Sequence, residues 1–284
     1  MRALLCLYSF LLGTFIASFL NVVIWRVPRG ESIVRPPSHC PKCNAPIRWY
    51  QNIPILSWLA LRGKCANCKA PISPRYILIE TLGGVLFLAA FCKWNPIDPF
   101  FWTPTLLMLL VAWVWISLMI VGSFIDFDLK LLPDFVTVGG MVLGLIAALF
   151  KSLLASLTVE SVSWKCLAPL IGSVAGLVFG FGLLWLIRYL GSKAFKREAM
   201  GLGDVFLMGA VGALFGPVAV LVTLILSSVF GSIVGVGMVA LSKTKFGKFV
   251  EIPYGPYICL GCLVWLFYGP QLVNWYVNLL TPGR

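Results

Sequence analysis

Two aspartates stand out among the ten acidic residues of this 284-residue chain because each adjoins an apolar segment. Asp126 directly follows the apolar run 106–125, and Asp204 opens another apolar run after the sequence Gly201-Leu-Gly203. Two carboxyl groups held close together cannot both ionise and therefore share a proton. One can then take a proton from water while the other donates one to a carbonyl oxygen, so the pair predicts hydrolysis of an amide bond.

Each aspartate also has a structural interpretation. Asp126 is compatible with a helix-end charge that reaches out to water, and Asp204 with a helix N-cap at the positive end of the helix dipole. Two observations favour the catalytic interpretation. Carboxylates at membrane depth are costly and usually functional, and Gly201 and Gly203 form a loop that permits close backbone approach. The only histidine, His39, lies far away in a polar segment, which argues against a Ser-His or Cys-His mechanism.

Four cysteines form a second candidate site. They occur as two Cys-x-x-Cys pairs, Cys40 with Cys43 and Cys65 with Cys68. Four thiolates at such spacing can close a tetrahedral, structural zinc site, whereas disulfides or free thiols are the alternatives. His39 adjoins Cys40, but four cysteines already complete the ligand set, so we interpret it as an uninvolved loop residue.

The elements that must position these residues are membrane helices. The chain is 60% hydrophobic and 11% charged along its whole length, which excludes a soluble domain of this size. We therefore predict an all-α polytopic membrane protein with about eight transmembrane helices and a small cysteine module. The expected helices start near Ala3, Tyr76, Phe100, Phe135, Leu167, Asp204, Pro217 and Pro256, and the sixth of them is short.

The charges predict the orientation of these helices. Most of the 22 basic residues fall in alternate loops, beginning with segment 26–75, and such loops usually face the cytoplasm. This places the cysteine module and both aspartates on the cytoplasmic side and both termini in the periplasm. The net charge of +12 then reflects topology and not nucleic-acid binding. A reducing cytoplasm favours a metal over disulfides.

Several motifs, taken in this order, resemble those of the bacterial type IV prepilin peptidases, which are bifunctional leader peptidase/N-methyltransferases. The motifs are Ser18-Phe-Leu-Asn21, the two cysteine pairs, Asn52-Ile-Pro-Ile-Leu-Ser57, Leu132-Pro133-Asp134, Gly201-Leu-Gly-Asp204 and Pro253-Tyr-Gly-Pro256. The resemblance implies that Asp126 and Asp204 cut the basic leader from prepilins or type II secretion pseudopilins at the bacterial inner membrane. It also implies methylation of the new N-terminal residue, usually phenylalanine, with S-adenosylmethionine as donor.

The same resemblance assigns parts of the chain to the two reactions. Residues 1–25 would form the first membrane helix, 26–75 a zinc module linked to methylation, and 76–284 the peptidase domain. Gly63 and Lys64 are the candidate methyl-transfer residues. One departure is Phe206, since many relatives carry lysine two residues after the second aspartate.

Two other functions are compatible with parts of the sequence. A proton- or ion-coupled transporter would use the membrane carboxylates as ion sites, and a scaffold would use the zinc module to bind a partner. A scaffold would tolerate loss of both aspartates, whereas an aspartyl peptidase would not.

Overall fold

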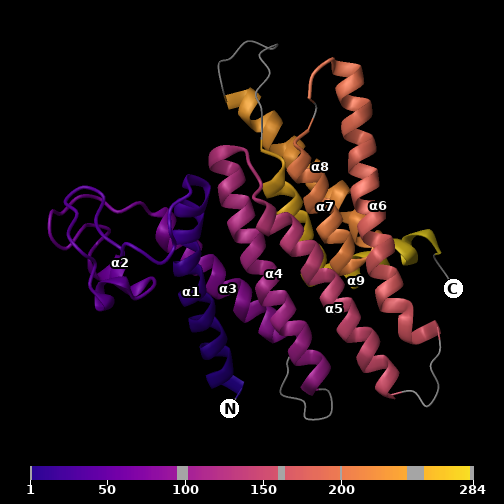
Figure 1. Cartoon of the computed structure of the whole chain (residues 1–284), viewed down its shortest axis with the longest axis horizontal. Coiled ribbons are helices and arrows are strands. Elements are labelled where there is room, and N and C mark those ends of the chain that lie inside the picture. Colours follow the sequence, from indigo (N-terminus) through magenta and orange to yellow (C-terminus); the bar gives the residue numbers. More distant parts are fainter. Residues whose placement is uncertain (1, 95–101, 159–163, 199, 242–252, 282–284) are drawn as a thin grey trace. The chain divides into compact units, whose positions relative to one another are not determined.

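The computed structural model describes residues 2–94, 102–158, 164–198, 200–241 and 253–281. Over these ranges the chain is helical, with two isolated β-bridges and no β-strand (Figure 1). The long helices are α1 (Arg2–Arg26), α3 (Arg75–Trp94), α4 (Trp102–Leu129), α5 (Asp134–Thr158), α6 (Trp164–Phe195), α8 (Pro217–Leu241) and α9 (Gly255–Leu280). The short elements are η1 (Val27–Arg29), η2 (Trp49–Asn52), α2 (Leu56–Ala60) and α7 (Leu202–Phe215).

The predicted membrane architecture is confirmed. Among the described helices, seven are long and apolar enough to cross a bilayer, and α7 is a shorter apolar helix of 14 residues. The predicted short sixth helix corresponds to α7. About 20 residues are needed to span the hydrocarbon core, so α7 cannot span it alone and depends on the helices around it.

The chain forms two compact units, 1–121 and 122–284, which divide within α4. This boundary reflects packing. The division at residues 25 and 75 that we predicted reflects composition and expected activity, and it stays a prediction.

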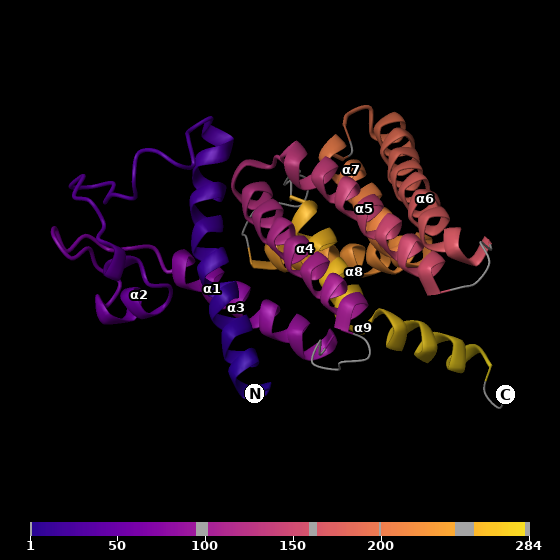
Figure 2. The same cartoon turned by 60° about the horizontal axis from the view of Figure 1, so that its bottom comes forward.

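In the first unit, α1 and α3 pack closely through small residues (Figures 1 and 2). A Cβ atom on Gly13 would lie 2.6 Å from the carbonyl oxygen of Gly83, so the glycines let the two backbones approach. Such contacts are typical of membrane helices, where lipid tails remove the hydrophobic drive for association. The ring of Trp113 stacks on Phe87 with 5.2 Å between the ring centroids, which ties the first half of α4 to α3.

Two buried charges hold the polar segment between α1 and α3. Arg26 donates hydrogen bonds of 2.8 Å to the carbonyl oxygens of Ser32 and Pro36. Glu80 of α3 accepts one of 2.7 Å from the backbone N–H of Ile55. Ile55 has a φ of 62°, which is unusual for a β-branched residue. These contacts tie the first part and the middle of segment 26–75 to α1 and α3.

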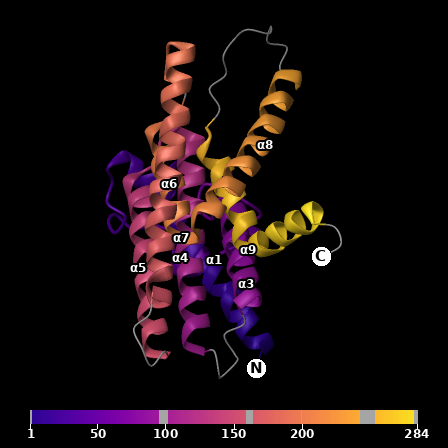
Figure 3. The same cartoon turned by 90° about the vertical axis from the view of Figure 1, so that its right-hand side faces the viewer.

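In the second unit, α7 is the central element. It contacts α5, α6, α8 and α9, and it lies among them in Figure 3. Nine of its residues are buried, namely Asp204, Val205 and all seven from Leu207 to Ala213. Gly212 of α7 and Gly176 of α6 touch backbone to backbone, so a side chain at either position would overlap the other helix. The Ser173 hydroxyl donates a 2.6 Å hydrogen bond to the carbonyl of Ala213. Neighbouring helices therefore cover the short helix that carries Asp204.

Candidate active site

Asp126 lies near the end of α4 and is buried, with 5% of its surface exposed. Its Oδ2 accepts a 3.0 Å hydrogen bond from the backbone N–H of Gly255, at the first turn of α9. A helix N-terminus presents unpaired N–H groups to anions. The contact joins residues 129 positions apart, and it orients a carboxyl group that could otherwise point into water. The interpretation of Asp126 as a helix-end charge reaching water does not fit this burial.

Asp204 lies in the first turn of α7 and is also buried, with 7% exposed. The N-cap of α7 is Gly201, which makes no side-chain capping bond, so Asp204 is not the N-cap residue. A Cβ on Gly201 would lie 3.5 Å from Oδ2 of Asp204. Gly201 therefore leaves room directly beside this carboxyl group.

Leu132 joins the chain segments that carry the two aspartates. A Cβ on Gly203 would lie 2.8 Å from Cβ of Leu132, and a Cβ on Gly255 would lie 3.2 Å from its Cδ1. The starts of α7 and α9 thus meet at one leucine, which lies six positions after Asp126 in the chain. The two carboxyl groups interact electrostatically. The structure therefore brings the predicted pair together in one buried place within the second unit.

Gly255 offers a test of how the Asp126 carboxyl group is held. A Cβ on this residue would lie 2.7 Å from Oδ2 of Asp126, so we expect Gly255→Ala to push the carboxyl group aside. The displaced atoms belong to the end of a side chain, so folding should be preserved. A displacement of about 1 Å can cost about 10²-fold in rate when a catalytic group is moved. We therefore expect kcat for the reaction of this site to fall by about 10²-fold.

The matched control is Gly182→Ala in α6, since a Cβ at Gly182 meets no atom within 4 Å. Both variants add one methyl group to a helical glycine of the second unit. Thermal unfolding in detergent should be similar for the two proteins, whereas only Gly255→Ala should lose activity. Full activity of Gly255→Ala would show that the position of Asp126 does not matter.

The four predicted metal ligands also come together. The sulfur atoms of Cys40, Cys43, Cys65 and Cys68 all lie within 4.8 Å of one another. The Cys40 and Cys68 sulfurs are 3.8 Å apart, close to the spacing of about 3.8 Å that a tetrahedral site with Zn–S bonds of about 2.3 Å requires. A disulfide would need about 2.05 Å. The four thiols are free, so the cluster fits a metal ion and does not form the disulfides that the sequence left open.

The two cysteine pairs sit in equivalent turns. The backbone N–H of Cys40 donates to the carbonyl of Ala45 at 3.0 Å, and that of Cys65 donates to Ala70 at 2.8 Å. Each turn contains one residue in the left-handed conformation, Asn44 with a φ of 53° and Lys69 with a φ of 57°. The sequence carries the matching pattern Cys-x-x-Cys-x-Ala-Pro-Ile twice, at 40–47 and 65–72. We did not predict this repeat, which accounts for the equivalence of the two turns.

Backbone N–H groups favour the thiolate form in these turns. The hydrogen bond from Ala45 is the main cause that lowers the pKa of the Cys43 thiol to about 6. The backbone of Cys68, and then that of Asn67, lowers the pKa of Cys65. Metal ligands must be deprotonated, so the protein prepares these two sulfurs for a cation.

The candidate methyl-transfer residues precede Cys65. Gly63 has a φ of 66°, and a Cβ there would lie 2.9 Å from the Trp58 ring, so this glycine is needed for the turn itself. Lys64 is exposed and forms an isolated bridge with Pro71. His39 lies outside the cluster and contacts the carbonyl oxygen of Pro37.

Two residues of the aspartate site were not predicted, namely Gly255 and Leu132. Both lie in motifs that we had quoted, but an N–H donor and a packing contact have no signature of their own in a sequence. Phe206, which replaces the lysine of many relatives, packs its ring against Phe181 of α6, with 5.4 Å between the ring centroids.

Comparisons with known proteins give a consistent result. Residues 11–94 match the model of the bacterial peptidase A24 N-terminal domain, and residues 113–236 match that of the type IV leader peptidase family. A protein of Myxococcus xanthus named prepilin leader peptidase/N-methyltransferase is 38% identical over 98% of this chain and 77% of its own length. Proteins of the same name from Aeromonas hydrophila and Pseudomonas aeruginosa are 36% and 34% identical, over 95% and 96% of this chain and 92% and 93% of theirs. No solved structure matches the chain significantly.

Proposed function

The chain belongs to the type IV leader peptidase family, and from this premise we propose that it cleaves the leader from prepilins and methylates the N-terminus that cleavage exposes. The observation that carries the proposal is that two buried aspartates converge: Asp126, near the end of α4, lies against the start of α9, and Asp204 lies in the first turn of α7, which meets the same place. The comparisons give no support to the transporter that the sequence left as an alternative.

In the peptidase reaction, one carboxylate takes a proton from a water molecule, and that water attacks the carbonyl carbon of the scissile peptide bond. The other, protonated, carboxyl group donates to the carbonyl oxygen, and the leaving amine finally receives a proton. The N–H of Gly255 holds Asp126 in place throughout. Either aspartate can take either role in this scheme.

In the methylation reaction, we propose that the cysteine module acts as a rigid support. Zinc fits the four sulfurs and would serve to fold the module, since a closed four-cysteine site has no open coordination position. S-adenosylmethionine would supply the methyl group: the neutral N-terminal amine would attack the methyl carbon, the S–CH3 bond would break to release S-adenosylhomocysteine, and the amine would lose a proton to solvent. Lys64 is exposed beside the cluster, where its charge suits a carboxylate such as that of the methyl donor.

The location follows from the same proposal. A multi-pass protein of the bacterial inner membrane, with the cysteine module in the cytoplasm and both termini in the periplasm, would place the aspartates at the cytoplasmic interface. A prepilin has a basic leader followed by an apolar helix, so its cleavage site lies at that same depth. The excess of basic residues in the corresponding loops supports this orientation.

The test is mass spectrometry of a purified prepilin incubated with the detergent-solubilised enzyme, with and without S-adenosylmethionine. We expect loss of the leader in both samples and addition of one methyl group only where the donor is present. An uncut prepilin under conditions in which a characterised relative cuts it would refute the peptidase proposal. A cut but unmethylated product would refute only the second activity.

A further inference from the structure

The loop that leads into α7 is held by a charged side chain of α6. Nε of Arg188 donates a 2.9 Å hydrogen bond to the carbonyl oxygen of Met200, and a terminal nitrogen of the same guanidinium group lies 3.2 Å from Oε1 of Glu198. The Arg188 side chain is 21% exposed, whereas that of Glu198 is 82% exposed. The ion pair is therefore open to water and contributes little, so the bond to the Met200 carbonyl is the contact that matters.

The peptide group between Met200 and Gly201 connects Arg188 to Asp204. Its carbonyl oxygen accepts the bond from Arg188, and its N–H, which belongs to Gly201, donates to the carboxyl group of Asp204. A trans peptide group is planar, with its C=O and N–H pointing in opposite directions. Fixing the carbonyl oxygen therefore also fixes the direction of the N–H, and a hydrogen bond at one end strengthens the donor at the other.

The start of α7 has no capping side chain of its own. Its N-cap is Gly201, which forms no side-chain hydrogen bond, and Gly203 follows two residues later. Glycine restricts the backbone less than any other residue, so this sequence does not by itself fix the direction of the Gly201 N–H. A side chain from a neighbouring helix can supply that restriction.

Arg188 continues the close packing of α6 against α7. A Cβ on Gly176 would overlap Gly212, and a Cβ on Gly180 would lie 2.5 Å from the carbonyl oxygen of Met208, so four residues forward on α6 correspond to four residues back on α7. The bond from Arg188 follows the same register, eight residues further along α6 and eight residues earlier on the facing chain. Residues four apart share one face of a helix. One face of α6 therefore packs against α7 through glycines and ends in an arginine at the loop.

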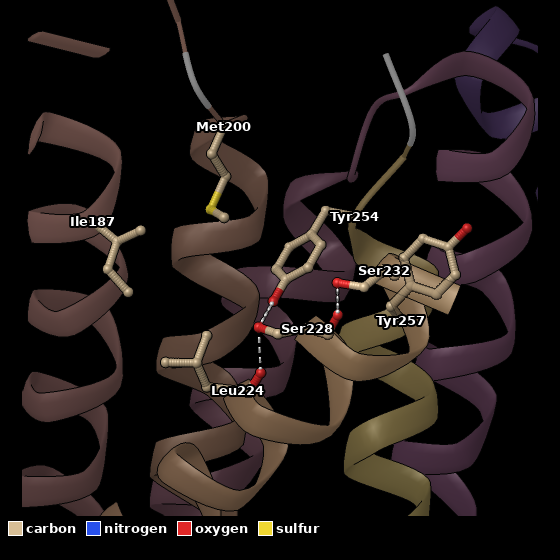
Figure 4. A pocket seen from close by; sticks show the side chains of 8 residues that line it. Ile187, Met200, Leu224, Ser228, Ser232, Tyr254 and Tyr257 are labelled. Carbon is tan, nitrogen blue, oxygen red and sulfur yellow. Dashed lines mark hydrogen bonds between the residues drawn. The ribbon is translucent and has the colours of Figure 1, made fainter. Parts of the chain in front are cut away.

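Met200 also faces α6 through its side chain. This side chain lines a cavity together with Ile187 of α6 and Leu224 of α8 (Figure 4). Ile187 and Arg188 are adjacent in α6, so one turn of this helix faces the side chain of Met200 and also bonds to its carbonyl oxygen. The position of Met200 is thus set by α6.

On the basis of the proposed function, we propose that Arg188 is a positioning residue for leader cleavage, which orients the Asp204 carboxyl group through the peptide group described above. Asp126 receives the same kind of support, since the N–H of Gly255 donates to it. Each carboxyl group is oriented by one backbone N–H, and Arg188 sets the direction of one of these two donors. Arginine suits this role because its nitrogens form a rigid fork, whereas lysine has a single ammonium group.

The variant is Arg188→Met, which keeps an unbranched apolar stem and removes all donors. A catalytic group that moves by about 1 Å can lose about 10²-fold in rate, so we expect kcat for leader cleavage to fall by about 10²-fold while KM stays within about threefold. Arg188→Lys keeps one donor and should recover about tenfold of that loss. A wild-type kcat in Arg188→Met would overturn the proposal. A kcat of Arg188→Lys as low as that of Arg188→Met would do the same, since the shape and not the hydrogen bond would then matter.

The matched control is Lys193→Met, which removes a positive charge at an exposed position five residues further along α6. Its kcat should stay within about threefold of the wild-type value. Methylation of a pilin that has already lost its leader separates positioning from misfolding, because the cysteine module belongs to the other unit. Arg188→Met should keep methyl transfer within about threefold, whereas a misfolded protein would lose both activities.

Arg188→Lys keeps the test decisive if Arg188→Met does not fold. It should lower kcat about tenfold relative to wild type, and a wild-type kcat would overturn the proposal. A wild-type enzyme that cuts no prepilin would instead overturn the proposed function itself, so the two failures are distinguishable.

Discussion

Either of the single substitutions Asp126→Asn and Asp204→Asn should abolish leader cleavage while leaving the protein folded. Asparagine has nearly the same shape as aspartate but can neither accept nor donate the proton in the scheme above. When catalytic residues act as a unit, removing one of them typically lowers the catalytic rate on the order of 10⁴-fold or more. We therefore expect single-turnover cleavage of a prepilin to fall by that factor in both variants, and the double variant to lose little more.

The matched control is Asp128→Asn. Asp128 stands two residues after Asp126 at the same end of α4 and is exposed, so the substitution removes the same charge without touching the buried pair. It should keep cleavage within about threefold, as surface substitutions usually do. Thermal unfolding of all three variants checks that they fold. Normal processing by either Asp126→Asn or Asp204→Asn would exclude the paired mechanism.

The helices and the cysteine cluster could be predicted from sequence because their causes are local. A run of about 20 apolar residues identifies a membrane helix without any tertiary information, and α1, α3, α5 and α8 begin within a few residues of the predicted starts. The cysteine pairs behave in the same way. Each Cys-x-x-Cys turn is completed by its own backbone, and the two turns then need only meet.

The details of the aspartate site could not be predicted, because they depend on contacts between distant segments. The donor to Asp126 is a backbone N–H 129 residues away, and any residue except proline carries such a group. The role of Leu132 depends on two glycines in α7 and α9 that leave space for its side chain. The chemistry of the two carboxyl groups was enough to propose them as the reacting groups, but the residues that hold them could not be read from the sequence.

The cysteine cluster should be required for methylation but not for cleavage. The cluster lies in the first unit, whereas Asp126, Asp204 and Gly255 all lie in the second, so each site is built from its own unit's residues. Losing one of four ligands should release the metal and unfold the small module, because so few residues have little core of their own. We therefore expect Cys40→Ser to lower methyl transfer by at least about 10²-fold and to keep cleavage within about threefold.

Cys92→Ser is the matched control, since it makes the same atomic change at an exposed cysteine of α3, outside the cluster. Bound zinc, measured by elemental analysis of the purified proteins, should be about one ion per chain in wild type and Cys92→Ser and far less in Cys40→Ser. Methyl transfer should follow the zinc content, whereas cleavage should not. If cleavage were lost together with zinc, the two units would have to act as one catalyst. If methyl transfer survived without zinc, the module would have another purpose.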